Sequence, residues 1–248
     1  MSQPTLKIVE KVLGSKDELA KELAQLIERA AAEAIKDRGL FTIGLSGGSL
    51  IKFVCNEVPS ITTDWSSWRL LLCDERMVPL TSPDSTLAAY IDGLVSATPL
   101  TQQQFLAVDT DKTAAEAATL YEQKIRELCG DSSASLPVLD LLLLGVGPDG
   151  HTASLFPGHP LLGEKTAWVA AITDSPKPPP SRVTLTLPVI NSARCCVLAL
   201  SGAEKADMIK RLRRERDSPV CADHLPASMV RPYNGELVWL LDAAAAAV

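Results

Sequence analysis

Short apolar runs alternate along the chain with segments whose apolar residues recur every three or four positions. The runs are typical of buried strands and lie at residues 41–45, 69–73, 138–144, 195–200 and 237–241. The periodic segments predict helices at residues 15–39, 49–56, 113–130 and 203–216. Continuously apolar strands separated by helices predict an α/β fold with a mostly parallel sheet. Helices would cover both of its faces in a Rossmann-like three-layer sandwich.

Capping signals define the ends of two of these predicted helices more closely. Ser15 and Glu18 have the spacing of a capping box, and Gly39 is placed to end that helix. Thr113 and Glu116 repeat the box. Gly130 marks the end of the second helix.

Residues 182–187 alternate apolar and polar side chains, which predicts a half-exposed antiparallel strand beside the parallel sheet. The Pro-rich residues 175–180 form the one linker-like stretch. This stretch is short and core strands follow it closely, so we expect a single domain over residues 1–248.

Composition excludes several classes of function. The 248 residues carry a net charge of −6 and only 4% aromatic residues, which disfavours binding to nucleic acid. No stretch approaches the roughly 20 apolar residues of a membrane span. The six cysteines lack the spacing of a metal site, and three lie in apolar runs. We therefore expect free thiols, a cytoplasmic protein and no metal.

The first chemistry-bearing segment is the loop at residues 44–49, which leads from a predicted strand into a helix. Gly47 and Gly48 lie between Ser46 and Ser49, and such a loop presents backbone N–H groups to an anion such as phosphate. The loop also matches the G-x-S-x-G nucleophile elbow of serine hydrolases, with Ser46 as nucleophile. The elbow needs earlier strands to build its oxyanion hole, so we treat this as the weaker interpretation.

Charged side chains follow the next predicted strand. Asp74, Glu75 and Arg76 come directly after an apolar run. Two carboxylates and a guanidinium at a strand end are suited to acid–base chemistry and to anion binding. A surface ion-pair cluster is the plain alternative.

The third segment follows the strongest predicted strand and contains His151. Residues 145–150 match G-x-G-x-x-G, but Pro148 lies in the loop and prolines at 157 and 160 exclude the long helix of a dinucleotide site. What remains is a glycine-flanked histidine two residues after Asp149. Histidine moves protons near neutral pH, and the chain has three.

Two cations lie in or beside the Pro-rich stretch. Lys177 lies within it and Arg182 follows it. Prolines stiffen the backbone, so less entropy is lost when these cations are fixed against an anion. A solvated surface loop is the alternative.

Together these segments resemble the 6-phosphogluconolactonase family, within the larger group that includes glucosamine-6-phosphate deaminases. The resemblance rests on four ordered motifs and two shorter segments, at residues 44–49, 73–79, 143–157, 174–186, 201–205 and 225–227. It implies a cytosolic enzyme of the pentose phosphate pathway. Such an enzyme hydrolyses 6-phospho-D-glucono-1,5-lactone to 6-phosphogluconate without a cofactor.

The resemblance suggests a role for each of these residues. We expect His151 to remove a proton from water and return it to the ring oxygen, and Asp149 to orient it or stabilise the loop. Asp74 is expected to contact sugar hydroxyls. The phosphate is expected over the loop at Ser46, Gly47, Gly48 and Ser49, with positive charge from Arg76, Lys177 and Arg182. The phosphosugar lactone is the expected partner of a monomer.

The chain departs from the family pattern at two places. Leu50 and Ile51 replace a common Thr-Pro, which leaves the backbone donors of the loop in place. Thr86 replaces a common Asn, so its polar role is open.

Two other functions stand beside the lactonase. Deaminases carry a glutamate five residues after the histidine, where this chain has Phe156, and the missing carboxylate favours the lactonase. A non-enzymatic sugar-phosphate sensor would use the same pocket, but we see no DNA-binding or signalling segment to accompany it.

Overall fold

A computed structural model describes residues 7–130 and 135–247. The strands are β1 (Lys7–Leu13), β2 (Phe41–Leu45), β3 (Trp68–Leu72), β4 (Asp74–Arg76), β5 (Phe105–Leu106), β6 (Leu141–Gly145), β7 (Val169–Ile172), β8 (Arg182–Leu185), β9 (Cys195–Leu200) and β10 (Glu236–Asp242). The helices are α1 (Lys16–Arg38), α2 (Ser49–Glu57), α3 (Thr86–Tyr90), α4 (Ala114–Cys129), α5 (Leu187–Ser192), α6 (Ala206–Arg216) and α7 (Ala243–Ala246). These ranges confirm the predicted strands and helices to within three residues at each end.

A seven-stranded parallel sheet forms the centre of the molecule, in the order β1-β10-β9-β6-β2-β3-β5. Successive residues of each strand point to opposite faces, and both faces are apolar. In β6, Leu141 and Leu143 enter one apolar cluster while Leu142 and Leu144 enter the other. This explains why the strands read as uninterrupted apolar runs.

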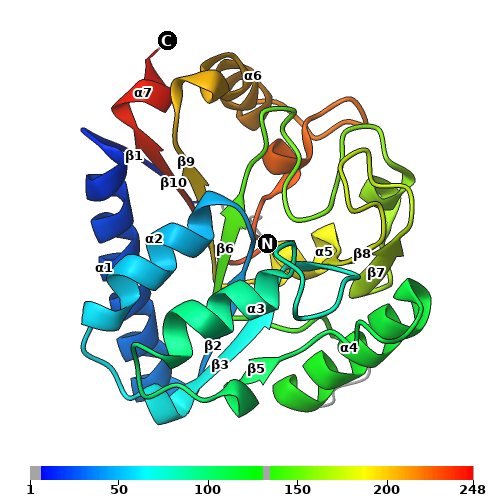
Figure 1. The fold of residues 1–248 in the computed structure, drawn as a ribbon. Helices are drawn as coiled ribbons and strands as arrows, with labels where there is room; N and C mark the ends of the chain where they lie inside the picture. The colour runs from blue at the N-terminus through cyan, green and yellow to red at the C-terminus, as the bar shows by residue number, and fades with distance from the viewer. Residues whose placement is uncertain (1–6, 131–134, 248) are drawn as a thin grey trace.

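Helices cover both faces of this sheet, as predicted. The helices α1, α2 and α3 pack on one face, while α4, α5, α6 and α7 pack on the other. Figure 1 shows α1, α2 and α3 grouped together, with α4 and α5 on the other side of the strands. The three-layer α/β expectation is therefore confirmed.

A second sheet, which the sequence did not predict, packs beside the first. It is three-stranded and antiparallel, in the order β4-β8-β7. The antiparallel strand expected near residue 182 is β8, but the expectation that it is half-exposed is wrong. The strand is buried on both faces because Thr184 finds buried partners, accepting a hydrogen bond from the Ser154 N–H and donating one to the Leu185 carbonyl.

The predicted helix ends are confirmed with one change. Ser15 accepts from the N–H of Glu18, but the Glu18 carboxylate accepts from the N–H of Gly14 instead of completing the box at Ser15. Gly39 ends α1 at a φ of 71°, which favours glycine. The second box, at the start of α4, is reciprocal as expected.

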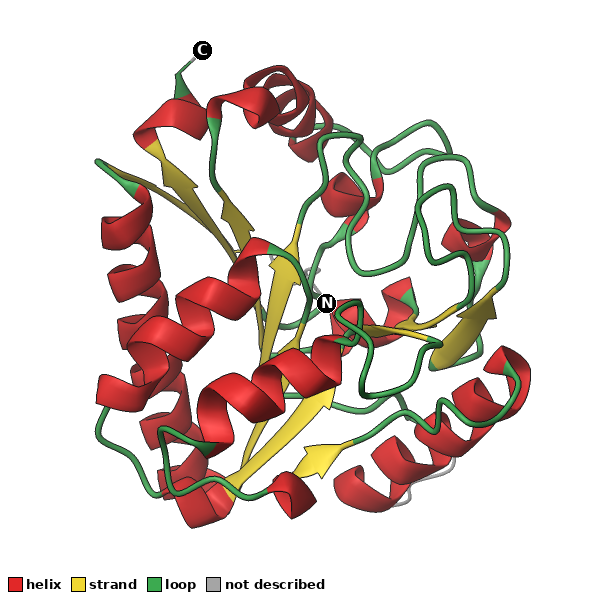
Figure 2. Cartoon of the chain, in the orientation of Figure 1, coloured by secondary structure: helices red, strands yellow, loops and turns green. Residues whose placement is uncertain are grey.

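The order of the strands places a crevice between β2 and β6. From β2 the chain proceeds to β3 and β5 on one side, and from β6 it proceeds to β9 and β10 on the other. Ligands bind at such switch points, beyond the carboxyl ends of the strands. Figure 2 shows long loops gathered at one side of the molecule, beyond the ends of several strands. Within residues 7–130 and 135–247, no helix is long and apolar enough to cross a membrane.

Candidate functional site

The loop after β2 presents the start of a helix to the crevice. Gly48 is the N-cap of α2 at a φ of 74°, and no side chain of the described residues caps this helix. Gly48 and Ser49 are exposed, so the first N–H groups of α2 are open to a ligand. Ser46 is buried beneath them, and its hydroxyl has no hydrogen-bond partner in the described chain.

The loop after β6 is a tight turn that carries His151. The N–H of Gly147 donates to the His151 carbonyl at 2.9 Å, and the N–H of Gly150 donates to the Gly147 carbonyl at 2.9 Å. A Cβ on Gly147 would overlap the imidazole of His151 and the carboxylate of Asp149. Glycine is therefore required at 147 to leave room for these two side chains.

Asp149 and His151 form a hydrogen-bonded pair within this turn. The His151 Nδ1 lies 2.5 Å from the Asp149 Oδ1. Burial lowers the pKa of His151 below its usual range, and the hydrogen bond that Asp149 accepts from Nδ1 only partly offsets this. His151 is thus neutral at pH 7. Its Nε2 has no protein partner among the described residues and is free to accept a proton.

Lys177 reaches the same pair from the Pro-rich loop. Its Nζ lies 3.0 Å from the Asp149 Oδ1 and 3.1 Å from the His151 Nδ1. Burial acts to raise the pKa of Asp149, but its bonds to His151 and Lys177 outweigh burial and lower that pKa. Asp149 is therefore a carboxylate at neutral pH.

Asp74 and Arg182 lie on adjacent strands of the second sheet. The Asp74 Oδ2 accepts from the Ser154 hydroxyl at 2.7 Å and lies 4.0 Å from the Arg182 guanidinium. Arg182 is 3% exposed and donates to the carbonyls of residues 177, 178 and 179. Its donors are thus largely occupied by the Pro-rich loop.

Arg76 reaches the glycine loop, whereas Glu75 turns away from it. An Arg76 Nη atom lies 3.8 Å from where a Gly47 Cβ would stand, and the Nε is buried without a partner in the described chain. The Glu75 carboxylate instead accepts from the N–H groups of Arg76, Thr86 and Leu87. Glu75 therefore caps α3 and does not enter the crevice.

Thr86 places its side chain next to the glycine loop. Its Oγ1 would lie 3.2 Å from a Cβ on Gly47 and is buried without a hydrogen-bond partner in the residues described. The position that departs from the family pattern therefore still presents a polar atom beside the loop.

One cavity of about 230 Å³ joins most of these residues. Its lining includes the loop at residues 46–49 together with Asp74, Arg76, His151 and Arg182. Asp149 and Lys177 are not among its lining residues and lie on the Nδ1 side of the imidazole. The volume lies below the roughly 300–1,000 Å³ of drug-sized ligand sites, which suits a molecule of monosaccharide size.

Lys205 also lines this cavity, and the analysis of the sequence did not single it out. It follows β9, in the short turn Ala203–Lys205 before α6. Burial lowers the pKa of its ammonium. In the sequence it belongs to a run of basic residues on an exposed helix. Besides the family-like segment at residues 201–205, only its place at the end of β9, next to β6, could have identified it.

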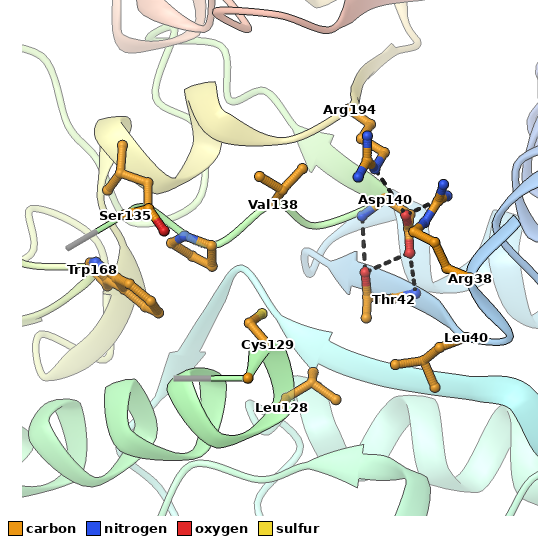
Figure 3. Close-up of a pocket in the computed structure, with 13 residues that line it drawn as sticks. Arg38, Leu40, Thr42, Leu128, Cys129, Ser135, Val138, Asp140, Trp168 and Arg194 are labelled. Atoms are coloured by element: carbon orange, nitrogen blue, oxygen red, sulfur yellow. Dashed lines mark hydrogen bonds and ion pairs between the residues drawn. The ribbon is translucent and has the colours of Figure 1, made fainter. Parts of the chain in front are cut away.

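A larger cavity of about 350 Å³ lies at the opposite ends of the strands (Figure 3). Two arginines, Arg38 and Arg194, point at Asp140 there, with N–O distances of 2.9 and 3.4 Å. Thr42 also donates to Asp140, through its N–H and its hydroxyl. Both arginines are thus engaged by Asp140, and the cavity lies at the amino ends of β2 and β6. It is therefore the weaker candidate for a ligand site.

Comparisons with known proteins agree with this fold and cover nearly the whole chain. A rat protein, 6-phosphogluconolactonase, is 46% identical over 242 residues, which cover 95% of this chain and 91% of the relative. The human 6-phosphogluconolactonase is 45% identical with the same coverage. The crystal structure of 6-phosphogluconolactonase from Thermotoga maritima superposes with a TM-score of 0.81 at 26% identity, covering 95% of this chain and all of that one.

The family described as glucosamine-6-phosphate isomerases/6-phosphogluconolactonase matches residues 14–239. This match includes every loop of the crevice. The chain therefore belongs to the glucosamine-6-phosphate isomerase/6-phosphogluconolactonase family.

Proposed function

We propose that this protein hydrolyses 6-phospho-D-glucono-1,5-lactone to 6-phosphogluconate in the oxidative pentose phosphate pathway. One observation carries the proposal: a neutral histidine whose Nε2 has no partner among the described residues shares a cavity with a helix N-terminus that no side chain of those residues caps. The first group suits removal of a proton from water, and the second suits a phosphate. The 46% identity to a relative named for this activity supports the same substrate.

The phosphate is assigned to the start of α2. The N–H groups of Gly48 and Ser49 would donate to its oxygens, and the dipole of α2 favours a negative charge there. Arg76 and Lys205 line the cavity and add positive charge. The donors of Arg182 are largely used by backbone carbonyls, so we assign it to holding the Pro-rich loop beside the site.

The lactone carbonyl is assigned to the His151 side of the cavity. The Nε2 of His151 takes a proton from water as the oxygen of that water bonds to the carbonyl carbon. The imidazolium then gives this proton to the ring oxygen as the ring C–O bond breaks, leaving a carboxylic acid that ionises. Asp149 holds Nδ1 and so fixes the tautomer with Nε2 unprotonated. The oxygen of Asp74 that Ser154 does not engage would accept from a sugar hydroxyl.

The serine-hydrolase and deaminase alternatives each require a side chain that the described residues do not place in the cavity. Ser46 makes no hydrogen bond to a base among the described residues, so nothing activates it as a nucleophile. Phe156 stacks beside His151 with ring centroids 5.0 Å apart, where a deaminase carries a carboxylate. An apolar ring cannot relay the protons that ring opening of an amino sugar requires.

The decisive experiment compares binding with turnover in His151→Ala. Removal of the base should lower the kcat for the phosphorylated lactone by about 10²–10⁴-fold, while the Kd for 6-phosphogluconate changes only a few-fold. Rates are measured in the presence of chelator and corrected for spontaneous hydrolysis, with unphosphorylated gluconolactone as the reference substrate. Loss of binding in proportion to turnover would contradict the assignment of His151 as the base.

We further propose that the enzyme is a cytoplasmic monomer. The loops of this chain line a cavity of monosaccharide size, as a monomeric enzyme requires. The six free cysteines suit a reducing compartment.

A further inference from the structure

The ammonium of Lys177 lies against the far side of the catalytic histidine. Its Nζ contacts the Asp149 Oδ1 at 3.0 Å and the His151 Nδ1 at 3.1 Å. We propose that Lys177 is a positioning residue, whose charge opposes protonation of His151 to the imidazolium, and that it does not bind the substrate phosphate. This inference rests on the proposed role of His151 as the base.

The location of Lys177 separates it from the phosphate loop. The cavity that holds Gly47, Gly48 and Ser49 is also lined by His151, but not by Lys177 or Asp149. The imidazole therefore presents its Nε2 side to the cavity and its Nδ1 side to the ammonium. To reach a phosphate on the loop, Lys177 would have to give up its ion pair with Asp149.

The backbone that carries Lys177 is fixed without help from its side chain. The Arg182 Nη2 donates to the Lys177 carbonyl at 3.0 Å, and the Ser175 hydroxyl donates to the same carbonyl at 2.8 Å. The Lys177 N–H in turn donates to the Ser175 hydroxyl at 3.2 Å. On the Lys177 side, these bonds involve only main-chain atoms. A substitution of the Lys177 side chain therefore removes the charge and leaves the loop in place.

The charges around His151 show what the ammonium does. Asp149 on its own turn and Asp74 on β4 both favour the imidazolium. Lys177 opposes it, and Arg76, Arg182 and Lys205 across the cavity carry the same sign. Lys177 is the cation in direct contact with the imidazole. Without it, the Asp149 carboxylate would favour the imidazolium more strongly, and a smaller fraction of His151 would be the neutral base.

The test is a titration of His151 in the Lys177→Met variant. The chain has only three histidines, so the His151 ring signal is assigned by its loss in His151→Gln. We expect the pKa of His151 to rise by about one to two pH units in Lys177→Met. It should stay unchanged in Lys165→Met, which removes an exposed lysine from the same region. Lys177→Arg retains the charge and should restore the titration.

The kinetic readout should follow the titration. In Lys177→Met, the acidic limb of kcat/KM should move to higher pH by the same amount, so that activity falls about tenfold or more at pH 6 and recovers above pH 8. The KM for the phosphorylated lactone at pH 8 should change less than two-fold. A large rise in KM with an unchanged His151 pKa would overturn the inference and return Lys177 to the phosphate.

The two proposals fail in different ways. If the His151 pKa moves in Lys177→Met but the rate profile does not, the role of Lys177 stands and the proposed role of His151 as base is wrong. If the His151 pKa does not move, the inference about Lys177 is wrong, and the His151→Ala experiment still decides the function. Circular dichroism of each variant shows whether the fold is retained.

Discussion

The guanidinium of Arg76 has one nitrogen that bonds to the protein and others that are placed to bind a ligand. One Nη donates to the carbonyl of Asp84 at 2.9 Å, which ties down the loop before α3. The Nε is buried without a partner in the described chain, and the second Nη faces Gly47. Unsatisfied buried donors are costly, so an arginine in this state is suited to receive an anion.

We expect Arg76→Ala to act mainly on KM. The phosphate is held equally in the ground state and the transition state, so its loss weakens binding without changing kcat. A charge-assisted hydrogen bond contributes about 1.5–3 kcal/mol, which predicts a rise in KM of about 10- to 150-fold. Steady-state kinetics with the phosphorylated lactone measure this, with the exposed Arg214→Ala as the control. A fall in kcat at constant KM would instead place Arg76 at the reacting carbonyl.

Some residues of the site can be predicted from the sequence because they have a local signal, whereas others are brought to the site only by the fold. The Gly47–Gly48 loop and His151 are identifiable because glycines and strand ends leave local signals. Glu75 and Arg76 are adjacent and look alike in the sequence, yet only the fold sends one to α3 and the other to the cavity. Lys205 lies in the family-like segment at residues 201–205, but nothing in that segment indicates a role at the cavity, since this role depends on β9 lying beside β6.

At the scale of elements, apolar runs predicted the interior strands well and the marginal ones poorly. The edge strand β1 mixes charged and apolar residues, and β5 has only two residues, so neither has a strand pattern. The second sheet joins β4, β7 and β8 from distant parts of the chain. No periodicity in the sequence indicates such a pairing, and the three charged residues of β4 have no strand pattern.

The start of α3 is held by the Glu75 carboxylate, together with the Ser85 cap. We expect Glu75→Ala to lower the free energy of unfolding by about 2 kcal/mol or more, because it leaves buried N–H groups of Thr86 and Leu87 without acceptors. Urea unfolding measures this, and the exposed Glu33→Ala is the matched control, with a change within about 0.5 kcal/mol. Equal midpoints for the two variants would show that α3 does not need this cap.

At the scale of the molecule, the site depends on contacts between the two sheets. The cavity takes its glycine loop from the parallel sheet and its Asp74 and Arg182 from the antiparallel one. The apolar residues of β8 pack in the same cluster as those of β9 and β10. Binding to such a site stabilises both sheets together.

We therefore expect residues 1–248 to unfold as one cooperative unit. Hydrogen exchange at increasing urea should show β8 and β9 losing protection at the same midpoint, because neither sheet keeps its apolar face covered alone. Adding 6-phosphogluconate at about 100 times its Kd should raise both unfolding free energies by the same amount, about 2.7 kcal/mol. Gluconate, which lacks the phosphate, is the control and should raise neither. Earlier loss of β8 than of β9 would divide the chain into two units, and the cavity would then open before the parallel sheet unfolds.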